Sequence, residues 1–394
     1  MGEKHLMNSY SRFDVEFENG SGTSIYDING REYLDFVAGV AVNSLGHCHP
    51  AIIQALDKQS KKLIHVSNLY WTPTQTQLAK KLVSLSDHAT VFFCNSGTEA
   101  NETAIKIGRK YGKLKGKAEK YEIIAMENSF HGRTMGALTV TGQTKYHKDF
   151  MPMIGGVNRI RFNDVGDLQK SISEKTCAVI VEPIQGEGGI INANKEFLME
   201  AKKLCEKYDA LLIFDEVQCG IGRSGDLFAY QSFGVIPDIV CLAKGLGGGF
   251  PIGAVLANER ASILKPGDHG CTFGGNPLGC AVSLAVLEEL VENKVIEGVK
   301  GKEKLFKKGI EELLQEYSFI KKIDGKGLMI GIHLDIEAKK VVNKAFDKGL
   351  LIIGAGSRAI RIVPPLNIST EEINRGLEIL AEVFKEVKKE LQFA

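Results

Sequence analysis

The feature that most constrains the fold is a series of short apolar runs bounded by polar or glycine-rich sequence. Two of them, ALLIFD and DIVCLAK, end at Asp215 and Lys244. Uninterrupted apolar runs of this length are typical of parallel strands that are buried on both faces. In open parallel sheets, ligands bind at the edge formed by the carboxyl ends of the strands. We therefore expect Asp215 and Lys244 to lie on nearby strands and to face one binding site.

Helical patterns alternate with these runs through the middle of the chain. Apolar residues recur at helical spacing from Thr98 to about Tyr111 and again over 195–208, and Ser96 with Glu99 fits a capping box before the first helix. Short strands separated by helices predict an α/β fold with a mostly parallel sheet covered on both faces. The expected strands are 91–95, 122–126, 177–181, 210–214, 238–243 and 253–257.

The length of 394 residues predicts two domains, since one core rarely grows this large. After about Gly279 the pattern changes to long charged helices around a few strands, which predicts a second, smaller α/β domain. Near the start, the segment YDINGREYLDFVAG predicts a hairpin that turns at Asn29-Gly30. The expected division is an N-terminal segment that joins the small domain (1–50), a large ligand-binding domain (51–280) and the small domain proper (281–394).

Composition and charge exclude several classes of function. A net charge of +1 argues against nucleic-acid binding, and no segment has the length and apolarity of a signal peptide or membrane span. The eight cysteines form no CxxC pair, which favours free thiols in a reducing cytoplasm. The triplet His47-Cys48-His49 precedes Pro50 and lacks a second ligand cluster, so it predicts a turn before a helix and no metal site.

The pairing of Lys244 with Asp215 predicts pyridoxal phosphate as cofactor. A buried lysine amine is nucleophilic enough to form a Schiff base with an aldehyde, and an aspartate can keep a pyridine nitrogen protonated. Ser96, Gly97 and Thr98 lie where a strand turns into a helix, a natural phosphate cradle. Taken singly, Lys244 could be a surface lysine and Asp215 a cap for the next segment; their combination favours the cofactor.

Three further segments fit such a site. SFHGRT offers Phe130 to stack on a ring and Arg133 to receive a carboxylate. EPIQGEGG presents two glutamates after a strand, and GCTFGGNP places Thr272 on a glycine-rich turn. Neither a Walker loop nor a dinucleotide fingerprint is present, which disfavours a nucleotide-dependent enzyme.

Six segments in order, SGTEANETAIK, SFHGRT, EPIQGEGG, FDEVQCGIGRSG, LAKGLGGGFPIGA and TFGGNPL, resemble the class III aminotransferases of fold type I. The resemblance covers nearly the whole chain, from LGHCHP to RIVPPL. It implies a large domain with a mostly parallel seven-stranded sheet flanked by helices, and a smaller α/β domain built from both terminal segments. It also implies a pyridoxal-phosphate-dependent transaminase that works as a homodimer with its sites at the interface.

The resemblance implies a role for each matching residue. Lys244 corresponds to the Schiff-base lysine and Asp215 to the partner of the pyridine nitrogen. The other residues expected to bind the cofactor are Gly97, Thr98, Phe130, Glu216, Val217, Gln218 (at the ring's 3′-oxygen) and, reaching the phosphate of the neighbouring subunit, Thr272. The residues expected to bind substrate are Arg133, Cys271, Arg361 and Glu187.

The segments HVSNLYWTPTQTQLAKKLV and SFHGRTMGALTVTGQTKYH most resemble members that act on acetylornithine. Those members pass its δ-amino group to 2-oxoglutarate by a ping-pong mechanism in arginine biosynthesis. In this interpretation Arg361 binds the α-carboxylate of glutamate, and Glu187 neutralises Arg361 in the other half-reaction. Ornithine, succinylornithine and 4-aminobutyrate remain alternative donors. A non-catalytic pyridoxal-binding regulator is a remote alternative, since it would tolerate loss of Lys244 or Asp215 and both are present.

Overall fold

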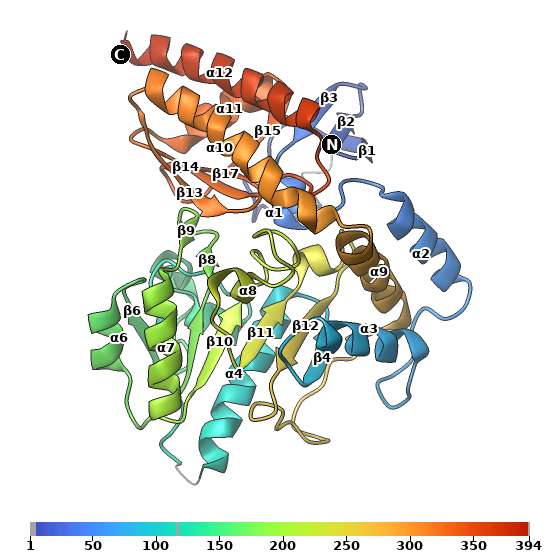
Figure 1. The fold of residues 1–394 in the computed structure, drawn as a ribbon, viewed down its shortest axis with the longest axis vertical. Coiled ribbons are helices and arrows are strands. Elements are labelled where there is room, and N and C mark those ends of the chain that lie inside the picture. Colours follow the sequence, from blue (N-terminus) through green and yellow to red (C-terminus); the bar gives the residue numbers. More distant parts are fainter. Residues whose placement is uncertain (1–4, 116–117, 393–394) are drawn as a thin grey trace.

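A computed structural model describes residues 5–115 and 118–392. Its largest feature is a seven-stranded sheet in the order β4-β12-β11-β10-β7-β5-β6 (Figure 1). β12 runs antiparallel to its neighbours β11 and β4, and the other adjacent pairs are parallel. The mostly parallel sheet expected from the sequence is therefore confirmed. The strands are β4 (Thr90–Cys94), β5 (Glu122–Met126), β6 (Val157–Ile160), β7 (Thr176–Val181), β10 (Leu211–Asp215), β11 (Ile239–Leu242) and β12 (Gly253–Ala257).

The apolar pattern predicted six of these strands and missed β6. Its sequence, VNRI, is short and half polar, and only Ile160 is fully buried. β6 lies at the edge of the sheet and pairs with β5 alone. An edge strand needs no continuous apolar run, and the pattern therefore gave no signal there.

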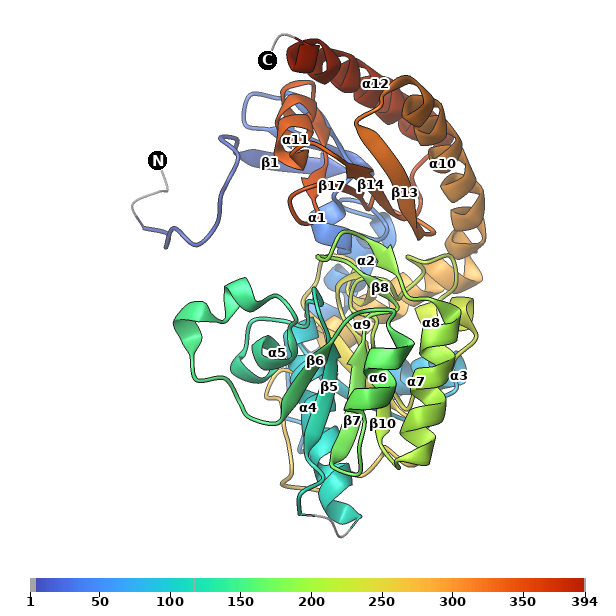
Figure 2. The same cartoon turned by 90° about the vertical axis from the view of Figure 1, so that its left-hand side faces the viewer.

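Helices cover both faces of this sheet, and successive strand residues face opposite helices. In β10, Leu212 packs in one apolar cluster with Phe197 of α7, while Ile213 packs in another with Ala104 of α4. This alternation follows from the two-residue period of a strand. Figure 2 shows α4 on one side of the sheet, with α6 and α7 on the other. The helices are α4 (Gly97–Leu114), α5 (Met135–Val140), α6 (Val165–Ser171), α7 (Lys195–Lys207) and α8 (Ala229–Phe233).

The C-terminal third forms an antiparallel sheet, in the order β13-β14-β17-β16, with long helices packed on it (Figure 1). Phe306 of α10 and Phe384 of α12 belong to the same apolar core as Ile330 of β14. The elements are α10 (Val299–Glu316), β13 (Ile320–Lys326), β14 (Met329–Leu334), α11 (Ala338–Asp347), β15 (Leu350–Leu351), β16 (Ile353–Gly354), β17 (Ala359–Ile362) and α12 (Thr370–Gln392).

The N-terminal strands join this C-terminal part. β1, β2 and β3 form an antiparallel meander, and β15 adds to β3 in parallel, with Leu350 opposite Leu34. The predicted hairpin is confirmed: Gly30 adopts φ 79° in the turn between β2 and β3, a conformation that suits glycine. The strands are β1 (Phe17–Ser21), β2 (Ser24–Asp27) and β3 (Glu32–Asp35), followed by the kinked helical turn α1 (Ala38–Ala41).

Two further helices, α2 (Pro50–Ser60) and α3 (Pro73–Ser84), pack against a third, α9 (Pro277–Leu287). The predicted turn before α2 is confirmed, because the side chain of His49 accepts a hydrogen bond from the N–H of Ala51 and caps the helix. The predicted domain boundaries at residues 50 and 280 fall at the first residue of α2 and within α9. The domain division itself stays a prediction. No helix among the described residues has both the length and the apolarity to cross a membrane.

Candidate active site

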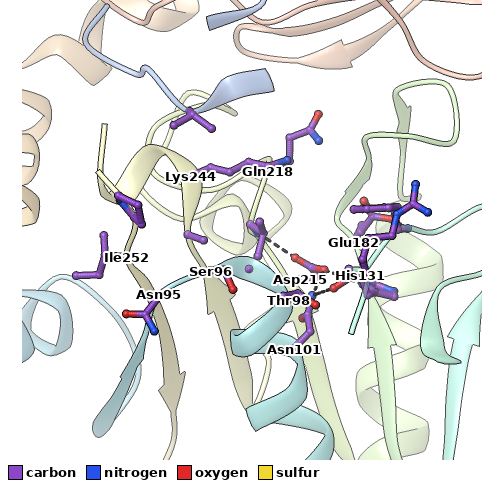
Figure 3. Close-up of a pocket in the computed structure, with 18 of the residues that line it drawn as sticks. Asn95, Ser96, Thr98, Asn101, His131, Glu182, Asp215, Gln218, Lys244 and Ile252 are labelled. Atoms are coloured by element: carbon purple, nitrogen blue, oxygen red, sulfur yellow. Dashed lines mark hydrogen bonds and ion pairs between the residues drawn. The ribbon is translucent and has the colours of Figure 1, made fainter. Parts of the chain in front are cut away.

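The carboxyl ends of β10 and β11 bring Asp215 and Lys244 to one edge of the large sheet. The two strands are parallel neighbours, with Asp215 opposite Cys241, and Lys244 follows two residues after β11 ends. Both side chains line a cavity of about 410 Å³ (Figure 3). Asp215 and Lys244 thus lie on neighbouring strands and at one cavity, as expected, and their roles in binding stay a prediction.

The backbone at Lys244 is strained in a way that fixes its direction. Lys244 adopts φ 42°, a left-handed conformation that costs a non-glycine residue roughly 1–3 kcal/mol. A tight turn holds it there, with the N–H of Gly247 donating to the Lys244 carbonyl over 3.0 Å. Gly247 is required because an added Cβ would lie 1.9 Å from the carbonyl oxygen of Phe250. Burial, reinforced by the positive charge of Arg361, lowers the pKa of Lys244 to about 8, which makes its amine a much better nucleophile near neutral pH.

Three donors hold the Asp215 carboxylate. Its Oδ2 accepts from the Asn101 amide and from His131 Nδ1, each at 2.7 Å, and its Oδ1 accepts from the N–H of Val217 at 3.0 Å. Burial lowers the pKa of His131, but its hydrogen bond and ion pair with Asp215 outweigh this effect, so the pKa is raised overall. Sequence reasoning missed Asn101 and His131. Both stand inside the quoted motifs, and their burial under Asp215 is what reveals their role.

The start of α4 lines the cavity through Ser96, Gly97 and Thr98. Ser96 Oγ caps the helix by accepting from the N–H of Glu99 at 3.3 Å. The Glu99 carboxylate accepts from the N–H of Asn95 at 2.6 Å, one residue earlier than the expected capping box. Gly97 and Thr98 therefore occupy the first helical turn, where N–H groups have no partner within the helix and attract anions. A Cβ at residue 97 would lie 2.5 Å from Val217 Cγ1, so only glycine fits.

The cavity walls suit a flat aromatic ring. Phe130, Val217 and Ile252 contribute apolar surface, and Figure 3 shows Ile252 across the cavity from Glu182. Burial raises the pKa of Glu182 to about 7, and its carboxylate accepts from the N–H groups of Phe130 (3.0 Å) and Gly186 (3.2 Å). Sequence reasoning gave Glu182 no role. An amine, a fixed carboxylate, apolar walls and free helix amides together fit the aldehyde, ring nitrogen, ring faces and phosphate of pyridoxal phosphate.

A buried arginine lies beside this cavity and is paired with a carboxylate. Arg361 of β17 is 3% exposed, forms an ion pair with Glu187 and donates to Gln218 Oε1 at 3.0 Å. Burial opposes ionisation of Glu187, but Arg361 outweighs it and lowers the pKa of this carboxyl group. The structure thus brings together three of the residues predicted from sequence, from three distant segments.

Three predicted residues lie elsewhere. Glu216 faces away from the cavity, because neighbouring side chains on extended backbone point to opposite sides. Its carboxylate accepts from the N–H groups of Ala229 (2.5 Å) and Tyr230 (2.7 Å), and burial raises its pKa to about 8. Cys271 and Thr272 line a second hollow of about 540 Å³ and not the first cavity.

The fold and this set of side chains define a pyridoxal-phosphate-dependent enzyme of fold type I. A match to the family described as Aminotransferase class-III spans residues 6–384. The chain belongs to the class III aminotransferase family, which confirms the resemblance noted in the sequence. It is therefore a transaminase whose cofactor is pyridoxal phosphate.

Similar proteins agree with this assignment. The chain is 56% identical over 387 residues to an acetylornithine aminotransferase of Clostridium acetobutylicum, covering 98% of this chain and 100% of the relative. Among solved structures, the ornithine aminotransferase of Toxoplasma gondii has a TM-score of 0.95 at 34% identity, covering 99% of this chain and 94% of that one. The N-acetylornithine aminotransferase of Stenotrophomonas maltophilia has a TM-score of 0.86 at 37% identity, covering 98% of each chain.

Proposed function

We propose that this protein transfers the δ-amino group of N2-acetyl-L-ornithine to 2-oxoglutarate, giving N-acetyl-L-glutamate 5-semialdehyde and L-glutamate, as a step of arginine biosynthesis. The observation that carries the proposal is the ion pair between buried Arg361 and Glu187 beside the Lys244 cavity. The choice of acetylornithine as amino donor is supported by the 56% identical relative, which is an acetylornithine aminotransferase.

The ion pair answers a problem that the two amino donors pose. Glutamate carries a carboxylate on its reacting carbon, and acetylornithine carries none there. Arg361 is the guanidinium that receives the carboxylate of glutamate. In the acetylornithine half-reaction it would be a bare buried charge, which costs several kcal/mol. Glu187 supplies the missing negative charge and withdraws when glutamate enters.

The residues around the cavity divide the chemistry of the reaction. Pyridoxal phosphate, when bound, supplies the electron sink for the pair of electrons left by proton removal. Lys244 holds the cofactor and, once its amine is free, moves the proton to and from the substrate carbon. Asp215, fixed by Asn101 and His131, keeps the pyridine nitrogen protonated. Gly97 and Thr98 would bind its phosphate, while Phe130 and Val217 would enclose its ring.

Similarity of fold does not distinguish acetylornithine from the other candidate donors. The TM-score of 0.95 to an ornithine aminotransferase reports a shared backbone at only 34% identity. Ornithine and acetylornithine differ by one acetyl group, far from the reacting amine, and pockets separate such pairs by only ~1–3 kcal/mol. The side chains that contact the acetyl group, and not the fold, therefore decide which substrate is preferred.

A spectroscopic titration tests the donor. Acetylornithine, succinylornithine, ornithine and 4-aminobutyrate are each added to the holoenzyme without an amino acceptor, and loss of the absorbance band of the bound cofactor is followed. We expect acetylornithine to act at the lowest concentration and to regain the band when 2-oxoglutarate is added. Ornithine or 4-aminobutyrate acting at equal or lower concentration would contradict the proposed substrate.

A homodimer with shared sites is part of the same proposal. The segment around Leu69 and Trp71 exposes 84% and 92% of these two side chains, and Asn68 ties it to the Cys271 carbonyl over 3.0 Å. Apolar patches of this kind mark interfaces, and Thr272 directly follows Cys271, to which this segment is hydrogen-bonded. Because Trp71 is the sole tryptophan, dimer formation should shift its fluorescence to shorter wavelength. A monomer in sedimentation at micromolar concentration would contradict the dimer.

We place the enzyme in the cytoplasm. All eight cysteines are free thiols, and six of them are buried. This usage suits a reducing compartment, where disulfides are rare. Labelling of the thiols in freshly isolated, denatured protein should find all eight reduced.

A further inference from the structure

The second arginine of the site, Arg133, is held by an aromatic ring. Its guanidinium carbon lies 3.8 Å from the ring centroid of Tyr146 and 5.5 Å from that of Phe130. The two rings meet edge to face, with centroids 6.3 Å apart and planes at 85°. Arg133 lines the cavity, whereas Tyr146 does not and contacts the site through Arg133 and Phe130. Tyr146 was not among the residues singled out from the sequence.

Arg133 also lacks the kind of partner that Arg361 has. Arg133 is exposed to solvent in the isolated chain, and no carboxylate of the described residues forms an ion pair with it. A guanidinium stacked on a ring keeps the N–H groups at its edge free for a planar carboxylate. The contact with Tyr146 thus fixes the orientation of Arg133 without consuming its donors.

The two arginines therefore differ in what a substrate must displace. A carboxylate that binds Arg361 must first displace Glu187, whereas one that binds Arg133 meets open donors. Under the proposed function, both acetylornithine and glutamate carry a carboxylate at the end remote from the reacting carbon. A receptor that serves both half-reactions needs no removable counter-charge, and this describes Arg133.

The turn that carries Tyr146 is itself anchored. Residues Thr144–Tyr146 form a 3₁₀ turn in which the N–H of Tyr146 donates to the Gln143 carbonyl at 3.0 Å. The next residue, His147, is 6% exposed and fixes the turn in the protein. Figure 2 shows this segment, after α5, at the side of the large sheet. These contacts hold the backbone segment that carries the Tyr146 ring.

We propose that Tyr146 is a positioning residue that orients Arg133 to bind the remote carboxylate of every substrate. The inference rests on the proposed function for the identity of the amino donor. Its main test does not depend on the amino donor, because it measures the binding of glutarate, a dicarboxylate that cannot react. Lys145, whose Nζ lies 4.9 Å from the same ring, keeps its positive charge when the ring is removed. A change in carboxylate binding therefore reports the lost orientation of Arg133 and not a change in local charge.

The test uses the holoenzyme with Tyr146→Leu, and with Tyr146→Phe as the matched control that keeps the ring face. The dissociation constant of glutarate, a dicarboxylate that cannot react, is measured by calorimetry. KM and kcat are measured with glutamate and with acetylornithine. We expect Tyr146→Leu to raise the glutarate constant and both KM values about 5- to 30-fold. Because the contact is remote from the reacting carbon, kcat should stay within about twofold. Tyr146→Phe should resemble the unchanged protein.

A double-mutant cycle with Arg133→Lys separates positioning from a general structural role. Lysine keeps the charge but not the planar fork, so Tyr146→Leu should then weaken glutarate binding by less than about twofold. The same weakening in both backgrounds, or unchanged glutarate binding in Tyr146→Leu, would overturn the inference. If Tyr146→Leu does not fold, Tyr146→Met is used, with the same expectations. If acetylornithine proves not to be the donor, the proposed function fails, but the glutarate result still decides the role of Tyr146.

Discussion

The charge of Glu187 should set the balance between the two amino donors. Glu187→Gln keeps a side chain of the same size that still accepts a hydrogen bond from Arg361, and it removes only the negative charge. Acetylornithine would then bind beside an uncompensated guanidinium that is 3% exposed. Glutamate would no longer have to displace a carboxylate. The variant should therefore favour glutamate at the expense of acetylornithine.

The magnitude follows from the contact. A hydrogen bond between charged groups contributes roughly 1.5–3 kcal/mol to stability, which corresponds to about 10- to 150-fold in an equilibrium or rate ratio. We expect the ratio of kcat/KM for acetylornithine to that for glutamate to fall by this factor. The charge of Glu187 also raises the pKa of Lys244, so its loss should lower that pKa further.

The assay is the rate of each half-reaction, followed by stopped-flow absorbance of the bound cofactor with one donor at a time. The control variant is Glu127→Gln, which changes an exposed glutamate directly after β5 at the same edge of the sheet. It should leave the ratio unchanged. If Glu187→Gln also leaves the ratio of the two kcat/KM values unchanged, the charge switch is refuted.

Three further outcomes follow from the structure. Apoprotein should take up pyridoxal phosphate covalently at a rate that rises with pH and levels off above about pH 8. The neutral amine of Lys244 is the reacting form, and burial together with the charge of Arg361 lowers its pKa to about 8. A rate that still rises at pH 10 would contradict this reasoning. His131→Phe removes a donor from Asp215 and should weaken cofactor binding about 10-fold or more in equilibrium dialysis, with unchanged affinity as the contrary result. Arg223→Met leaves the carbonyl oxygen of Pro364 without its donor and should lower the free energy of unfolding by about 1–3 kcal/mol in urea titration, whereas equal stability would contradict the contact.

Much of the large sheet could be predicted because burial on both faces leaves a direct trace in sequence. Ile213 and its neighbours in β10 must all be apolar, since one set of side chains meets α4 and the other meets α7. The same local logic predicted the start of α4 at Ser96. It failed at β6, where an edge position removes the need for an apolar run.

The residues of the candidate site likewise fall into those that local sequence could predict and those that it could not. Lys244 and Asp215 were predictable because each directly follows its own apolar run. Glu216 was predicted as a cofactor residue from its place in the motif, but strand geometry turns its side chain the other way. Tyr146 lies within a segment that carries the resemblance, but nothing in the sequence distinguished it, because a tyrosine in a polar turn looks the same whether or not an arginine stacks on its ring.

By itself the sequence determined what depends on near neighbours: the period of each strand, the caps, and the motifs of the family. Only the tertiary structure decided which charges meet. Arg361, Glu187 and Gln218 are far apart in the chain, and their contact exists because β17 lies over the edge of another sheet. An ion pair depends on the distance between side chains in space, and separation along the chain does not report that distance.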